Sequence, residues 1–265
     1  MRYPADPQGT YAEIMNCRCT LVAALDGVSD DASKRWSKLP EGMTYEQWKG
    51  ANKAYSSLKR QLDTSESISA NIMRNVLKPF IPLGAEAGKS AADYLNLGDM
   101  PSRKVKLFDE AMKYVPTKML RELKRNNVKA SWSNALERSE YDPAINTITI
   151  AKRADALSVV HEIMHAVESN NGAFIQAEKE YFKQRTDNKE VKSLREITGN
   201  ANYTKIEKAF VVEKCINPYT FKDYNGRNYE LMSMGVETLF RSPLSFKNDL
   251  NMLKWVLSML VRFGV

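Results

Sequence analysis

Histidine and cysteine are scarce in this chain, which contains two histidines and three cysteines among 265 residues. Cys17 and Cys19 are too close in sequence to form a comfortable disulfide, and Cys215 alone cannot complete a disulfide framework. Long apolar runs are also missing, because Lys254 interrupts the nearest approach to one, residues 250–261. We therefore expect a reduced chain with no transmembrane segment and no membrane partner.

The N-terminus has no basic stretch followed by an apolar core, so we expect no secretion signal and an intracellular origin. The formal charge of +7 comes from lysines and arginines that are scattered among carboxylates and do not cluster. This pattern predicts no specific nucleic-acid partner. An apolar content of 43% is enough to form a folded core, so the chain is expected to be globular.

Turn-forming residues and helical periodicity divide the chain into three parts. Residues 1–40 are rich in turn formers and predict an extended tail, and residues 41–100 predict a helical connector. In the connector, Thr44 and Gln47 have the spacing of a capping box at the start of a helix. Residues 101–265 form the third part. Helices are predicted over 44–62, 68–77, 105–114, 119–123, 155–170, 173–186, 203–214, 230–240 and 246–262.

Both histidines lie in the segment His161-Glu-Ile-Met-His165, which follows the best predicted strand, residues 146–150. Residues four apart on a helix project from the same side, so both imidazoles can bind one ion. A catalytic zinc ion takes one further protein ligand and keeps a position for water. Glu162 can reach that water without binding the metal and can act as general base. The segment therefore predicts a hydrolytic Zn2+ site.

Chance gives two histidines this spacing, with glutamate after the first, in roughly one such chain in two thousand, an estimate from composition. The alternative interpretation is a pair of exposed helix histidines, or a degenerate site that keeps the motif without activity. A third ligand is expected from Glu230 or Glu237, which lie two turns apart on similar faces of a downstream helix. The other glutamate could then orient a histidine. Nearer carboxylates stand in charge-rich segments typical of solvated surfaces, namely Asp187, Glu190 and Glu196.

The order of the Asn146-Thr-Ile-Thr-Ile strand, the HEIMH helix and Glu230-x-x-Ser233 resembles the glutamate zincins, the zinc metallopeptidases that include thermolysin. The resemblance covers about residues 130–240. It implies an α+β, mostly helical zincin-like fold with a small sheet beside the HExxH helix. It also implies that Glu230 is the third ligand. The interval from His165 to Glu230 is longer than in thermolysin, which keeps Glu237 open as the ligand.

The same resemblance implies a metallopeptidase that hydrolyses a protein or peptide substrate. Family members often use a tyrosine or histidine to hydrogen-bond the oxyanion, and the absence of a third histidine leaves Tyr224 or Tyr229 for this role. We predict that the strand over 147–150 lies at the rim of the cleft above the His161 helix. There an extended substrate could pair with it, while its apolar residues face the core.

A second resemblance lies at the N-terminus, where the segment YPADPQGTYAEIMNCRCTLVAAL is similar to the end of the phage head morphogenesis domain of Mu-type minor head proteins. Those proteins commonly finish in an NCRC segment before variable C-terminal extensions. The resemblance implies phage head proteins as partners, and the phage virion or the host cytoplasm as the location. It also defines the alternative function, a non-catalytic minor head protein whose zincin-like fold serves for binding.

Overall fold

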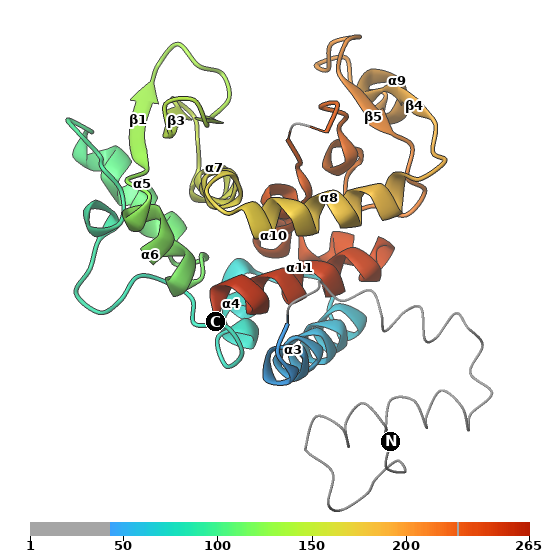
Figure 1. Cartoon of the computed structure of the whole chain (residues 1–265), viewed down its shortest axis with the longest axis horizontal. Coiled ribbons are helices and arrows are strands. Elements are labelled where there is room, and N and C mark those ends of the chain that lie inside the picture. The colour runs from blue at the N-terminus through green and yellow to red at the C-terminus, as the bar shows by residue number, and fades with distance from the viewer. Residues whose placement is uncertain (1–42, 227) are drawn as a thin grey trace, which may run out of the picture. The chain divides into compact units, whose positions relative to one another are not determined.

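Two helices that are distant in sequence form the centre of the fold, α7 (Ala156–Ser169) and α10 (Leu231–Arg241), and they pack side by side (Figure 1). This computed structural model describes residues 43–226 and 228–265. Asp155 begins α7 by accepting a hydrogen bond from the Ser158 backbone amide at 2.8 Å, as expected for a helix N-cap. The predicted tail over 1–40, with Cys17 and Cys19, lies outside the described residues.

A layer of helices from both ends of the described chain supports this pair. The C-terminal helix α11 (Leu250–Gly264) packs against α3 (Tyr45–Thr64) and against α10, and α4 (Ala70–Leu77) packs against α10 (Figure 1). The predicted capping box is present at the start of α3: Thr44 and Gln47 exchange two backbone-to-side-chain hydrogen bonds of 3.0 and 3.2 Å. Residues 41–100, predicted as a helical connector, thus belong to the same compact unit as the rest of 41–265.

A three-stranded sheet lies on the other side of α7, in the order β1-β3-β2. The predicted strand is confirmed as β3 (Thr147–Ala151), and its Ile148 and Ile150 side chains are fully buried. It pairs in parallel with β1 (Lys129–Ser133) and antiparallel with β2 (Glu140–Asp142). Because both edges of β3 are occupied, the prediction that a substrate pairs with β3 is wrong. Within the described residues, β2 pairs only with β3 and leaves its outer edge open.

The predicted helix over 203–214 is also wrong. This region contributes β5 (Lys208–Phe210), which pairs antiparallel with β4 (Val191–Ser193). Lys208 is exposed and Ala209 is buried, so burial alternates as in a strand, and the pairing with β4 satisfies backbone groups that a helix would satisfy internally. The sequence pattern also missed α9 (Leu194–Thr198), which begins at the end of β4.

The remaining predicted helices are present with shifted ends, as α5 (Ser102–Met112), α6 (Thr117–Arg125) and α8 (Gly172–Thr186). Short 3-10 helices connect other elements: η1 (Ala91–Asp93), η2 (Pro218–Phe221) and η3 (Pro243–Asn248). The mixed α+β class, mostly helical with small sheets, is therefore confirmed. Among the helices of residues 43–226 and 228–265, none has the length and apolarity needed to cross a membrane.

Candidate metal centre

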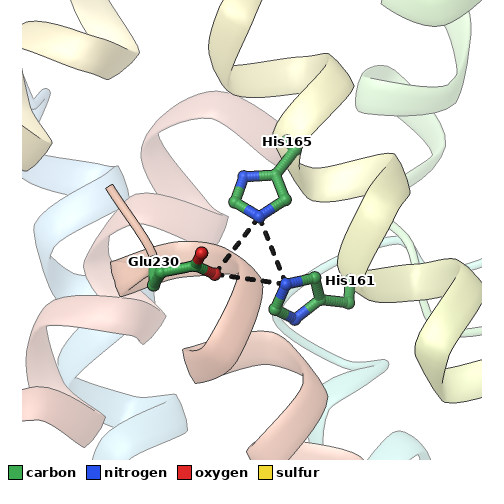
Figure 2. A group of neighbouring side chains, drawn as sticks. All are labelled: His161, His165 and Glu230. Atoms are coloured by element: carbon green, nitrogen blue, oxygen red, sulfur yellow. Dashed lines mark hydrogen bonds and ion pairs between the residues drawn. The ribbon is translucent and has the colours of Figure 1, made fainter. Parts of the chain in front are cut away.

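The imidazoles of His161 and His165 project from one face of α7 toward the start of α10, where Glu230 points back at them (Figure 2). The two histidine Nε2 atoms are 3.2 Å apart. Glu230 Oε2 lies 3.2 Å from His161 Nε2 and 3.3 Å from His165 Nε2. Three potential ligand atoms therefore form a nearly equilateral triangle.

The size of this triangle fits a metal ion. In a tetrahedral site with bonds of about 2.0 to 2.1 Å, neighbouring ligand atoms lie about 3.3 to 3.4 Å apart. The observed separations of 3.2, 3.2 and 3.3 Å are close to those edges. The buried group of His161, His165 and Glu230 could thus hold a metal ion and leave a fourth position open.

Carboxylates on the far side of each imidazole fix which nitrogen faces this centre. His161 Nδ1 is 3.0 Å from Glu237 Oε2, and His165 Nδ1 is 3.0 Å from Glu168 Oε2. Because a carboxylate accepts hydrogen bonds, each Nδ1 is assigned as the N–H donor. In the neutral form of each histidine, Nε2 then directs its lone pair toward the centre, which is the tautomer that a metal requires.

The electrostatics of the group also favour a cation. Two lone pairs and a carboxylate converge at one site, and this arrangement favours a positive charge among them. Burial lowers the pKa of His161, but its hydrogen bonds to Glu230 and Glu237 outweigh this effect and raise the pKa to about 9. Burial raises the pKa of Glu230, but the charge of His165 and the hydrogen bonds to both histidines hold it well below its usual value. A proton can meet the need for positive charge, and a metal ion would have to displace it.

Glu230 directly precedes α10 and is only 4% exposed. The Tyr224 hydroxyl donates to Glu230 Oε1 at 2.5 Å, while Ser233 Oγ donates to Glu230 Oε2 at 3.3 Å. Tyr224 thus occupies one carboxylate oxygen and directs the other toward the histidines. Burial raises the pKa of Tyr224, so its hydroxyl stays a donor.

Glu162 differs from the other glutamates of the site. Its side chain lines the same cleft as the histidines and the residue is 7% exposed. Burial is the largest cause that raises the pKa of Glu162, while the neighbouring His161 and His165 lower it. A carboxylate with a raised pKa is a stronger proton acceptor than an exposed one, which suits a general base.

The centre lies in a cleft of about 860 Å³. One wall comes from the segment around β2, with Glu140 and Tyr141. The lining is also rich in tyrosine and includes both predicted tyrosines; its members from the downstream segment are Tyr203, Tyr219, Tyr224 and Tyr229. Tyr229 packs against Phe182 with ring centroids 5.1 Å apart. No hydrogen bond to the Tyr229 hydroxyl occurs in the part of the chain that the structure describes.

The structure adds residues that the sequence reasoning missed. Glu168 lies three residues after His165, a helical spacing that could have identified it. Lys222 has no such signal: it directly follows η2, and its ammonium lies 4.8 Å from the ring centroids of both Tyr219 and Tyr224. The three nearer carboxylates are exposed and do not line the cleft, namely Asp187, Glu190 and Glu196.

No family model, curated protein or solved structure matches the chain. The geometry therefore defines the class by itself: an α+β protein with a buried His-His-Glu centre that could hold a metal ion.

Proposed function

We propose that the protein is a zinc-dependent metallopeptidase of the glutamate-zincin type. The observation that carries this proposal is the convergence of His161 Nε2, His165 Nε2 and Glu230 Oε2 on one point, with Glu162 on the same helix. Two histidines and a glutamate, with one open position, are the ligand set of peptidase zinc sites.

A zinc ion bound by these residues supplies a Lewis acid and lowers the pKa of water. In the proposed reaction, Glu162 accepts a proton from the attacking water and then donates it to the leaving amine. Glu237 and Glu168 hold the two imidazoles in the required tautomer. The Tyr224 hydroxyl is already engaged with Glu230, so we propose Tyr229, which lines the same cleft, as the donor to the developing oxyanion.

An extended peptide could enter the cleft along the open outer edge of β2, whose Glu140 and Tyr141 line the cleft wall. This replaces β3 as the strand for substrate pairing. We propose phage head proteins as the substrate or partner, in the virion or the host cytoplasm. This last part rests on the resemblance of the N-terminal segment, which lies outside the described residues.

The test combines metal content with activity against a mixed peptide library. The purified protein should contain about one zinc ion per chain and cleave the library. Glu162→Gln should retain zinc and lose hydrolysis by about 10²- to 10⁴-fold, the usual contribution of a general base. A matched control is Glu122→Gln, which removes a half-buried carboxylate that pairs with Arg125 on α6 and does not line the cleft.

Two results would contradict the proposal. Undiminished cleavage by Glu162→Gln would end the general-base assignment. A zinc-loaded protein that cleaves no peptide in the library would favour the alternative, a non-catalytic head protein that uses the fold for binding.

A further inference from the structure

Arg241 is the last residue of α10 and lies outside the group of metal ligands. We infer that it is a positioning residue for the metal centre and that it acts on His161 through Glu237. The inference rests on the metal site of the proposed function, but it does not require that the protein cleaves peptides.

The contacts of Glu237 carry the first step. Arg241 Nε donates to Glu237 Oε1 at 2.8 Å, while Glu237 Oε2 lies 3.0 Å from His161 Nδ1. Each carboxylate oxygen therefore has its own partner, and the carboxylate plane is held at both ends. If Arg241 is removed, Glu237 can rotate, and the His161 ring loses its fixed acceptor.

The contacts of Asp155 carry the second step. Arg241 Nη1 and Nη2 donate to the two oxygens of Asp155, both at 2.7 Å. Asp155 is the N-cap of α7, so the guanidinium joins the C-terminal end of α10 to the N-terminal end of α7. The helix dipole also favours the positive Arg241 at the C-terminal end of α10 and the negative Asp155 at the N-terminal end of α7. Because α7 carries both histidines and Glu230 directly precedes α10, Arg241 connects the elements that supply all three ligands.

The shape of the guanidinium matters more than its charge. The Arg241 side chain is 39% exposed and that of Glu237 is 19% exposed, and ion pairs at such sites contribute little to stability. A planar guanidinium can donate in fixed directions to Glu237 and to both oxygens of Asp155 at once. A lysine ammonium has no such fixed geometry. Arg241→Lys should therefore keep the charge and lose the positioning.

A positioning role and a purely electrostatic role predict opposite changes in zinc affinity for Arg241→Gln. Removing a positive charge near a cation site should strengthen metal binding if charge alone matters. If positioning dominates, zinc affinity should fall by about 10-fold, the lower end of the range for groups that orient a metal ligand, in both Arg241→Gln and Arg241→Lys. Chelator competition measures this affinity.

A matched control is Arg121→Gln, which breaks an ion pair with Glu86 that does not line the cleft, and it should leave zinc affinity unchanged. Unchanged or tighter zinc binding by Arg241→Gln would overturn the inference. Full recovery of the affinity in Arg241→Lys would also overturn it, because charge would then be sufficient. If Arg241→Gln does not fold, as judged by circular dichroism, the lysine variant still decides.

Nuclear magnetic resonance of the imidazoles gives a second readout, because the chain has only two histidines. In zinc-loaded protein, Arg241→Gln should shift or broaden the Nδ1–H signal of His161. The signal of His165, whose Nδ1 faces Glu168, should stay in place. Equal changes at both histidines would indicate general loosening and would reject the positioning role, as would no change at either.

The wild-type measurements separate this inference from the proposed function. Zinc binding without peptide cleavage removes the peptidase and leaves the role of Arg241 intact. A wild-type protein that binds zinc, with Arg241 variants that bind it equally well, removes only the role of Arg241. A wild-type protein that binds no zinc contradicts both.

Discussion

At the scale of single residues, the chemistry of the site depends on which partner each glutamate has. Glu230 faces the two Nε2 atoms, while Glu237 and Glu168 face one Nδ1 atom each. Glu162 has no hydrogen bond to another side chain among the described residues, and burial raises its pKa. Four carboxylates of one residue type thus stand in three different surroundings.

Substitution of either histidine should abolish metal binding, because two ligands cannot hold the ion in the geometry that three define. We expect His161→Ala and His165→Ala each to lose the zinc that the wild type carries, as measured by elemental analysis after zinc-replete expression. Stoichiometric zinc in both variants would contradict this prediction, because the ion would then bind elsewhere.

The two downstream glutamates should respond differently to the same substitution. Glu230→Ala removes a carboxylate that contacts both Nε2 atoms and should remove the metal. Glu237→Ala leaves the three ligands in place but removes the acceptor for His161 Nδ1, and it should weaken zinc binding by about 10- to 100-fold. Affinities measured side by side decide the ligand. If only the Glu237 variant loses zinc, Glu237 is the metal ligand and the assignment of Glu230 is wrong.

At the scale of elements, the approach of α11 to α10 depends on one missing side chain. A Cβ atom placed at Gly235 of α10 would lie 2.5 Å from Val256 Cγ2 of α11, a contact that stiff β-branched valine cannot relieve by rotating. Gly50 of α3 offers a contrast, because a Cβ atom there would meet Val261 Cγ1 at an ordinary 3.8 Å.

The same substitution at these two glycines should therefore have opposite effects on the free energy of unfolding. Gly235→Ala should destabilise the protein by about 1 to 3 kcal/mol through overpacking. It should also weaken zinc binding, because α10 follows Glu230 directly. Gly50→Ala should stabilise the protein by about 0.5 to 1 kcal/mol, since alanine favours a helix interior. Chemical denaturation measures the free energy of unfolding of both variants. If Gly235→Ala stabilises the protein, α10 and α11 can move apart without losing stability, and the prediction is wrong.

At the scale of the whole molecule, residues 41–265 form one compact unit with a continuous buried core. The core joins residues from α3, α7, α10 and α11, so the first described helix is part of the support for the site. The metal centre draws all its ligands from this unit.

A chain of residues 41–265 should therefore fold alone and bind zinc with the affinity of the full chain. A zinc concentration of about 1,000 times Kd should stabilise both chains by about 4 kcal/mol, seen as a rise in Tm that a chelator reverses. His161→Ala in the short chain is the control and should show no rise. If the short chain is unfolded while the full chain is folded, the core is not self-sufficient.

The amino-acid sequence alone determined the parts of the site that depend on local geometry. The i, i+4 spacing of His161 and His165 needs only a helix, and the caps of α3 and α7 begin their helices through contacts within three residues. Alternation over Thr147–Ala151 marked β3 in the same way. These features depend on periodicity and on hydrogen bonds between residues that are close in sequence, so they can be predicted from local residue patterns.

Only the tertiary structure decided the features that pair distant segments. The strand at 208–210 was predicted as a helix because the strand that it pairs with, β4, lies elsewhere in the sequence, so local periodicity does not reveal the pairing. The apolar and polar alternation in β1 and β2 is too short to indicate a strand. The choice of Glu230 over Glu237 at the Nε2 atoms depends on how α10 crosses α7. Arg241 meets Asp155 across 86 positions. Such contacts form when the apolar faces of distant elements pack together. The sequence shows which faces are apolar, but it does not show which faces pack against each other.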